Sequence, residues 1–266
     1  MKKGISFFFG YSNDIRDRAK QIKNFGFDCV MTNQDPRFND DNGTINKQIE
    51  LFKINNLEVS TLHNQYKTEE LEFLWTDTEI GDRLEETLKQ DILTASKYGF
   101  KSVVVHTMGN YNKIGEARLL RLLELCEKSN VFLAIENIDY KQPFADIFEN
   151  ISHPYLKFCY DSGHNNCFDP EFDYLEKYGD KLICFHLHDN NGKQDQHTLN
   201  KFGTINWKNL AKKLSKLNLE NISLDYELLL YCEERSSVSL EECLSETYRQ
   251  ACELEEMILK YKKDNL

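Results

Sequence analysis

The sequence predicts an α/β protein that folds as one (β/α)8 TIM-barrel domain spanning residues 1–266. Short apolar segments alternate with longer segments of helical apolar spacing, and this unit recurs eight times along the chain. No linker or low-complexity segment interrupts the series, and 266 residues is an ordinary length for such a barrel. A doubly wound open sheet is the alternative, but no glycine-rich phosphate-binding motif follows the first predicted strand. The barrel is therefore the favoured fold.

The predicted strands are short runs of apolar and β-branched residues, which favour extended backbone. The first run meets a turn at Gly10, and its apolar part is too short for the core of a signal peptide. The strands are expected at Lys3–Phe9, Phe27–Met31, Leu57–His63, Phe100–His106, Val131–Glu136, Leu156–Asp161, Leu182–His188 and Asn221–Glu227.

A predicted helix follows each strand. Gly26 and Gly99 end two of these helices, as glycine commonly does after the last helical turn. The final helix ends in the basic run Lys260-Tyr-Lys-Lys263, which suits the negative end of a helix dipole. The helices are expected at Asn13–Phe25, Ile45–Asn55, Ile80–Tyr98, Glu116–Ser129, Phe144–Asn150, Phe172–Tyr178, Asn206–Leu217 and Leu240–Lys262.

Composition narrows the class of protein. The net charge of −11 provides no global basic surface for nucleic acid or an anionic membrane, although it leaves a local basic patch open. No apolar run reaches membrane-spanning length, and the eight cysteines form no CxxC pair. We expect a cytoplasmic protein with reduced, mostly buried thiols and no membrane association. The sequence leaves open whether the chain forms a homo-oligomer.

Chemistry-bearing side chains stand at the carboxyl ends of six successive predicted strands. In a barrel these strand ends meet on one face, where active sites of this fold lie. The densest stretch, residues 182–197, contains three histidines and two aspartates around an Asn/Gly-rich loop. Imidazole and carboxylate together are the ligand set that suits zinc, manganese or iron. The residues are His63, His106, Glu136, Asp161, His164, His186, His188, Asp195, His197 and Glu227.

These residues carry different weight when each is considered alone. Glu136 and Glu227 end apolar strands, and a buried carboxylate is costly unless a cation compensates its charge. A histidine such as His63 or His106, considered alone, is more often structural than a metal ligand. We predict these two as site residues only because the other residues of the group accompany them. We rank His188 below its neighbours and expect its side chain to turn toward the loop or the helix–sheet layer.

The motifs resemble those of the xylose isomerase-like TIM-barrel superfamily, which holds sugar-phosphate isomerases and epimerases and the endonuclease IV type of apurinic endonuclease. The resemblance runs from the strand ending in His63 to Glu227. Its most specific part is the series His186-Leu-His-Asp-Asn-Asn-Gly192, Asp195-Gln-His197 and Gly203-Thr-Ile-Asn-Trp207.

The resemblance implies a divalent metal, manganese or zinc. Four residues match the ligands of the single ion used by the sugar epimerases: Glu136, Asp161, His186 and Glu227. Five more match the extra ligands that complete the three-zinc cluster of endonuclease IV: His63, His106, His164, Asp195 and His197. We expect one ion, with up to three as the alternative.

The function that this resemblance favours is a sugar or sugar-phosphate isomerase/epimerase. Its mechanism would use a metal-stabilised enediolate, with Glu136 and Glu227 as the acid/base pair. The alternative is an endonuclease IV-like, multi-zinc phosphodiesterase acting on abasic DNA, and a third hypothesis is a barrel that only binds a sugar. His188 stands where endonuclease IV has Asn, which favours the sugar enzymes. Substrate-binding roles would then fall to His63, His106, His164 and His188.

Overall fold

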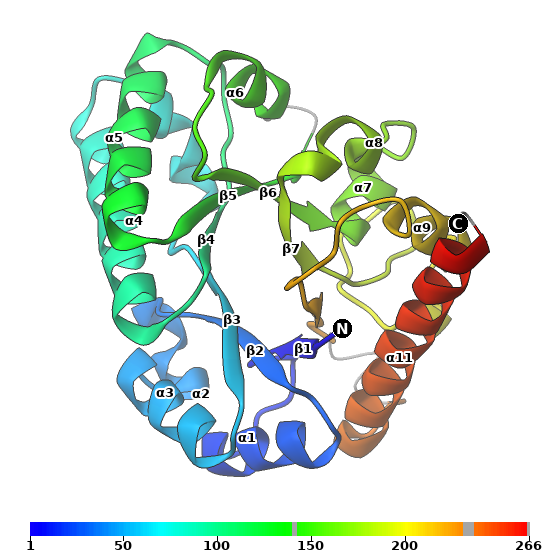
Figure 1. Ribbon diagram of the computed structural model, residues 1–266. Coiled ribbons are helices and arrows are strands. Elements are labelled where there is room, and N and C mark those ends of the chain that lie inside the picture. The colour runs from blue at the N-terminus through cyan, green and yellow to red at the C-terminus, as the bar shows by residue number, and fades with distance from the viewer. Residues whose placement is uncertain (140–142, 231–236, 265–266) are drawn as a thin grey trace.

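The computed structural model describes residues 1–139, 143–230 and 237–264, and in it eight parallel strands form a nearly closed barrel (Figure 1). Their order in the sheet is β7-β6-β5-β4-β3-β2-β1-β8. The bounds are β1 Lys3–Ser6, β2 Cys29–Asn33, β3 Glu58–His63, β4 Ser102–Val105, β5 Phe132–Glu136, β6 Leu156–Asp161, β7 Leu182–His186 and β8 Leu224–Tyr226. These strands overlap the eight predicted runs, and the barrel prediction is confirmed.

The barrel closes between β7 and β8 through one residue beyond the end of β7. The Leu187 backbone N–H donates to the Asp225 carbonyl at 2.8 Å, and the Glu227 N–H donates to the Leu187 carbonyl at 2.9 Å. Most observed strands are shorter than predicted, and β1, β4, β7 and β8 end before the predicted run does. The residues beyond the strands are therefore placed by loops.

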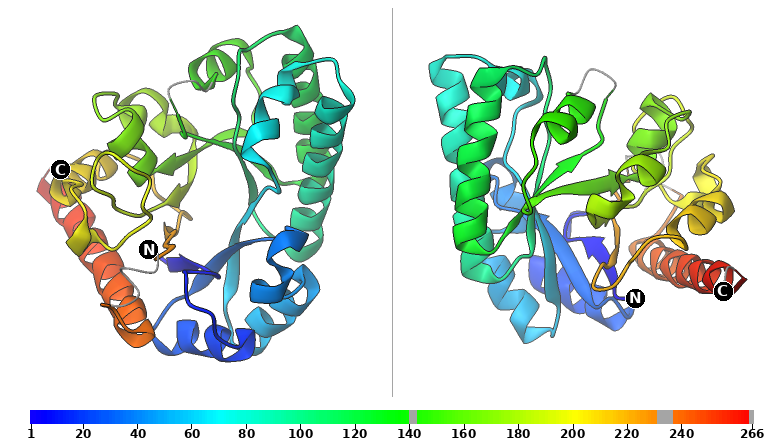
Figure 2. Two further views of the ribbon diagram at one scale, coloured as in Figure 1. Left: turned by 180° about the vertical axis from the view of Figure 1, so that it is seen from behind. Right: turned by 45° about the horizontal axis from the view of Figure 1, so that its top comes forward.

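Helices surround the sheet, and α11 runs beside α9 on the side where the chain ends (Figure 2). None of the described helices is long and apolar enough to cross a membrane. The α-helices are α1 Ile15–Asn24, α2 Asn39–Asn42, α3 Ile45–Ile54, α4 Glu79–Tyr98, α5 Lys113–Ser129, α6 Phe144–Asn150, α7 Ser162–Phe168, α8 Tyr174–Tyr178, α9 Trp207–Leu214 and α11 Leu240–Asp264. Single 3-10 turns or short 3-10 helices are η1 Pro36–Phe38, η2 Thr68–Trp75, η3 Gly179–Lys181 and η4 Asn200–Phe202.

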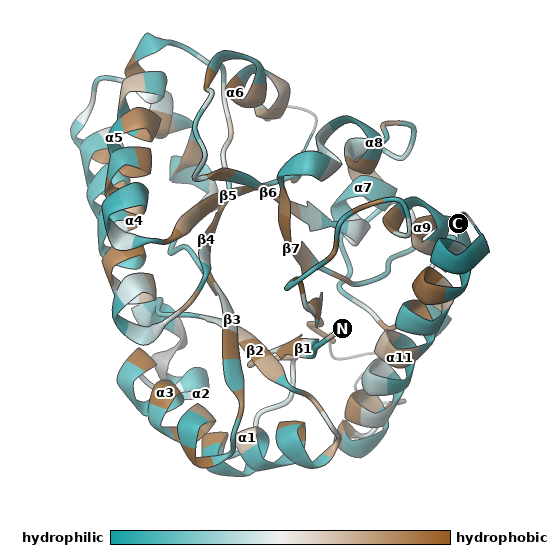
Figure 3. Ribbon diagram, in the orientation of Figure 1, coloured by the Kyte–Doolittle hydropathy of each residue, from teal (hydrophilic) through white to brown (hydrophobic). Residues whose placement is uncertain are grey.

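Capping residues explain where the longest helices begin and end. The Thr78 hydroxyl accepts a hydrogen bond from Gly81 N–H at the start of α4, and Gly99 ends it with a φ of +84°. Asn112 Oδ1 accepts from Ile114 N–H and Gly115 N–H, so α5 begins three residues before the predicted Glu116. The helices bury an apolar stripe against the sheet and expose polar residues on the outside (Figure 3).

The inside of the barrel is packed with small side chains. Val104, Ala134, Cys159 and Cys184 form a separate cluster there, one residue from each of β4 to β7. Side chains two residues apart on a strand point to the same face, so the next inward positions of these strands are residues 106, 136, 161 and 186. The strands therefore place a layer of histidines and carboxylates next to this cluster.

Candidate metal centre

Two glutamates from opposite parts of the chain face the same imidazole nitrogen. Glu136 ends β5, and its Oε2 lies 2.9 Å from His186 Nδ1. Glu227 follows β8, and its Oε2 lies 3.0 Å from the same nitrogen. Both ring nitrogens of His186 are buried and make no well-formed hydrogen bond to the described residues. A nitrogen ligand atom between two carboxylates is an arrangement that could hold a divalent cation.

Asp161 completes a group of four donors whose ligand atoms all lie within 4.8 Å of one another. It is held rigidly at the junction of β6 and α7, where its Oδ1 accepts from the His164 backbone N–H at 2.6 Å. The Asn137 side chain locks the backbone of Asp161, accepting from its N–H at 2.8 Å and donating to its carbonyl at 2.9 Å. The group comprises the four residues predicted to bind a single ion: Glu136, Asp161, His186 and Glu227.

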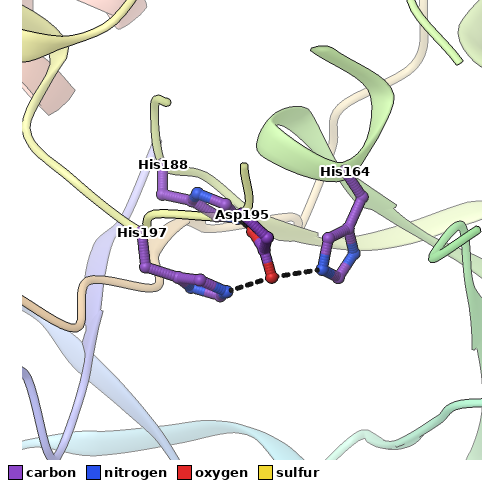
Figure 4. A group of neighbouring side chains, drawn as sticks. All are labelled: His164, His188, Asp195 and His197. Carbon is purple, nitrogen blue, oxygen red and sulfur yellow. Dashed lines mark hydrogen bonds and ion pairs between the residues drawn. The ribbon is translucent and has the colours of Figure 1, made fainter. Parts of the chain in front are cut away.

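A second group of donors lies beside the first (Figure 4). Asp195 Oδ2 lies 3.2 Å from His164 Nε2 and 3.1 Å from His197 Nε2. His188 belongs to this group, with its ring stacked on that of His197 at 3.8 Å. Its Nε2 lies 3.1 Å from both carboxylate oxygens of Asp161, so this ring joins the two groups.

The expectation that His188 turns away from the site is wrong. Strand β7 ends at His186, so the backbone at His188 is set by a loop contact instead of the sheet. The Ser162 hydroxyl accepts from His188 N–H at 3.0 Å and donates to the His188 carbonyl at 2.7 Å. Gly163 gives the ring its room, because a Cβ there would lie 1.9 Å from His188 Cε1. All of the predicted site residues therefore meet at one place.

Two further histidines, the last residue of β3 and the first residue after β4, lie beside Glu136. His106 Nε2 is 3.2 Å from Glu136 Oε2, and His63 Nε2 is 3.6 Å from the same oxygen. His63, Glu136 and His186 form a third group of donors. The chemistry of these donors fits divalent zinc or manganese, and the number of ions that they hold stays a prediction.

One buried aspartate that the sequence did not single out fixes the loop after β7. Asp189 Oδ1 accepts from the backbone N–H groups of Asn190, Thr204 and Ile205 at 2.8–3.0 Å. Its Oδ2 accepts from the Trp207 indole at 2.7 Å. These bonds connect the Asp-Asn-Asn-Gly motif to the Gly-Thr-Ile-Asn-Trp motif. The loop carrying Asp195 and His197 is closed by this carboxylate.

Burial and charge have opposite effects on the ionisation of the site. Burial would raise the pKa of Glu136, but the positive charges of His186 and His106 hold that pKa well below its usual range. Burial would lower the pKa of His186, but the charges of Glu227 and Glu136 raise it well above. Burial also opposes the proton on His197, but the hydrogen bond to Asp195 raises the pKa to about 9. Protonated imidazoles thus balance the carboxylates, as a divalent cation would.

A cavity of about 440 Å³ opens beside the donor groups. Glu227, His63 and His197 line it, whereas Glu136 does not. Its other walls come from the ends of β1 and β2, the segment after β3 and the residues after β8. These walls contain residues that were not predicted from the sequence as part of the site. They include Phe7, Asn33, Asp35, Arg37, Tyr66 and Leu229. They lie in loops or at strand ends without a metal-binding motif, so no spacing identified them.

The fold is shared by solved structures, one of which is described as a sugar epimerase. A structure described as a D-tagatose 3-epimerase-like protein has a TM-score of 0.74 at 19% identity, covering 100% of this chain and 99% of that one. The D-psicose 3-epimerase of Clostridium cellulolyticum H10, solved with D-tagatose, has a TM-score of 0.74 at 14% identity, covering 97% and 99%. The IOLI protein, solved with a zinc atom, has a TM-score of 0.69 at 16% identity, covering 98% and 99%.

Curated relatives are closer in sequence but uncharacterized. Protein y4fM of Sinorhizobium fredii is 29% identical over 192 residues, which cover 65% of this chain and 60% of that protein. Protein MJ1614 of Methanocaldococcus jannaschii is 33% identical over 111 residues, which cover 37% of this chain and 43% of that protein. The matched parts thus span about half of the length of these relatives.

The sequence profile of one protein family matches most of the chain. The profile is that of the xylose isomerase-like TIM barrel, and it covers residues 19–239. This range includes every residue of the three donor groups. The chain therefore belongs to the xylose isomerase-like TIM-barrel family.

Proposed function

We propose that the protein is a divalent-metal-dependent isomerase or epimerase of a sugar or sugar phosphate. The observation that carries this proposal is the convergence of Glu136 and Glu227 on one nitrogen of His186, at 2.9 and 3.0 Å. Two carboxylates that share one centre suit a reaction in which a proton leaves one carbon and returns to the same or the adjacent carbon. The similarity in fold to the D-tagatose 3-epimerase-like protein and the D-psicose 3-epimerase supports the choice.

The structure distinguishes the two glutamates. The side chain of Glu227 is 22% exposed and lines the cavity, whereas that of Glu136 is 1% exposed beneath the histidines. Burial would raise the pKa of Glu227, but His186 holds it below the usual range, so this carboxylate is ionised and can accept a proton. We assign to Glu227 the removal of the proton from the carbon next to the substrate carbonyl.

The returning proton needs a donor on the Glu136 side of the centre. His164 Nδ1 lies 3.1 Å from Glu136 Oε1. Burial would lower the pKa of His164, but the charge of Asp161 and its contacts with Asp195 and Glu136 raise it well above the usual range. We assign the return of the proton to the Glu136 side of the centre, where His164 and Glu136 lie in contact. The bound metal would supply positive charge that stabilises the negative charge developing on the substrate oxygens.

A second candidate function is favoured by the second donor group. His164, His188, Asp195 and His197 offer four more ligand atoms within 4.8 Å of one another. Additional zinc there would suit a phosphodiesterase that acts on abasic DNA, because more than one ion can activate water and neutralise a phosphate. Its signature is cleavage of abasic-site DNA and no conversion of sugars.

The test of the proposed function is hydrogen exchange into ketoses. Metal-loaded protein is incubated in D2O with a panel of ketohexoses and ketopentoses and their phosphates, and carbon-bound deuterium is followed by NMR. Deuterium should enter at the carbon next to the carbonyl, and Glu227→Gln should slow this exchange by about 100-fold or more, because the proton acceptor is lost. Glu124→Gln, on the outer face of α5, is the control and should exchange like the wild type. Full exchange by Glu227→Gln would contradict the assignment.

A further inference from the structure

Tyr66 lies beside the metal centre without belonging to any of its donor groups. It follows the end of β3 by three residues, and its ring centre lies 4.6 Å from that of His106 and 5.5 Å from that of His63. Together with His63, His197 and Glu227, it lines the 440 Å³ cavity. The ring therefore contacts both the donor residues and the space in which a substrate would sit.

The segment that carries Tyr66 is fixed from two directions. The backbone N–H of Gln65 donates to Asp91 Oδ2 at 3.0 Å, and the side chain of Gln65 donates to Asp91 Oδ1 at 3.0 Å. Asp91 lies on α4 and is fully buried. The Arg37 guanidinium donates to the carbonyl oxygen of Tyr66. The ring is thus held in place before a ligand binds, which reduces the entropy lost on binding.

The phenol offers two kinds of contact. The hydroxyl of Tyr66 can donate one hydrogen bond and can also accept hydrogen bonds. The ring face offers rigid apolar surface, and Phe7 and Leu229 add apolar area to the same cavity. A sugar has C–H faces and hydroxyl edges, so it can use both kinds of contact.

We propose that Tyr66 is a substrate-binding and specificity-determining residue, whose hydroxyl donates a hydrogen bond to one hydroxyl group of the bound sugar. Its ring covers the His63 and His106 side of the metal centre. This role rests on the proposed isomerase or epimerase function. Because Tyr66 would hold the substrate without taking part in proton transfer, its loss should weaken binding more than turnover.

The test compares wild type and Tyr66→Phe, both metal-loaded, on a ketose that the wild type converts and on analogues that each lack one hydroxyl group. Tyr66→Phe should raise KM about tenfold and change kcat by less than about threefold, since one hydrogen bond to a neutral group is lost. With the wild type, one deoxy analogue should have a kcat/KM about tenfold below that of the parent ketose. With Tyr66→Phe, that analogue and the parent ketose should have the same kcat/KM. This result would show that the Tyr66 phenol hydrogen-bonds the hydroxyl group that the analogue lacks.

Tyr111→Phe is the matched control. Tyr111 lies in the loop between β4 and α5, and its hydroxyl donates to Glu116 away from the cavity. This variant should keep the wild-type KM and the wild-type preference among the deoxy analogues. Metal content is measured for every variant, and it should be the same in Tyr66→Phe as in the wild type.

Three results would overturn the role of Tyr66. If the wild type converts a ketose and Tyr66→Phe has the same KM and the same preference among analogues, the role is wrong and the proposed function stands. If Tyr66→Phe loses metal together with kcat, the residue supports the metal centre instead of the substrate. If the wild type neither binds nor converts any ketose of the panel, both proposals fail together.

Discussion

At the scale of single residues, protons and a metal ion compete for the same imidazoles. The pKa values of His164 and His186 are raised well above the usual range, and that of His197 is raised to about 9, in each case by carboxylates that outweigh burial. In the metal-free protein the neighbouring carboxylates therefore favour the protonated form of these rings. A metal ion can bind an imidazole only after the ring loses its proton.

This competition predicts that metal affinity rises with pH. Binding of Mn²⁺ at pH 7 should release about one proton or more per ion, and the affinity should increase from pH 6 to pH 8.5, because a higher pH favours loss of the protons that the ion displaces. Calorimetric titrations in two buffers with different ionisation enthalpies measure the number of protons released. An affinity that does not change with pH, with no proton release, would show that the histidines do not bind the ion.

The sequence predicted the position of the site well and the orientation of its side chains less well. Glu136, Asp161 and His186 stand on strand ends, where a period of two decides which face a side chain occupies. His188 and Tyr66 stand beyond strand ends, where contacts with Ser162 and Asp91 place the backbone. Such contacts join residues far apart in the chain, so a single sequence carries no local signal for them.

At the scale of structural elements, the loop between β7 and α9 depends on one carboxylate. Asp189 is fully buried and accepts three backbone N–H groups and the Trp207 indole. Asp189→Ala would leave these donors buried without partners. The variant should lower the free energy of unfolding by about 3 kcal/mol, since each unsatisfied buried donor costs about 1–3 kcal/mol and the loop can partly relax. Urea denaturation followed by circular dichroism measures this change.

The control for this prediction is an aspartate that makes few contacts. The side chain of Asp180 is 74% exposed and lies 3.7 Å from Lys181. Asp180→Ala should change the free energy of unfolding by less than about 0.5 kcal/mol. Equal stability of Asp189→Ala and Asp180→Ala would mean that Asp189 does not hold the loop.

Two short elements, α7 and η2, were not predicted from the sequence. Helix α7 is only seven residues long, and the side chain of Asp161, itself a donor of the site, caps it. Helix η2 follows the segment that carries Tyr66 and packs against α4. Both elements depend on tertiary contacts, which override weak local propensity in short segments.

In the whole molecule, the barrel brings side chains from regularly spaced strand ends together in one site. The alternation of strands and helices was sufficient to predict the fold, because each parallel strand must be followed by a crossover to the next. Closure through Leu187 and Tyr226 brings the ends of β7 and β8 together, and with them His186 and Glu227. The net charge of −11 and the acidic donors are consistent with a site for a cation.

We claim that one divalent ion serves the Glu136 and Glu227 pair, and the metal content of the purified protein tests this. The protein would be purified without added metal or chelator, and its metal would be counted by elemental analysis together with that of Glu136→Gln. We predict about one manganese or zinc ion per chain in the wild type and about one tenth of that in the variant, because a buried ligand is lost. Two or three zinc ions per wild-type chain would contradict the claim and favour the phosphodiesterase.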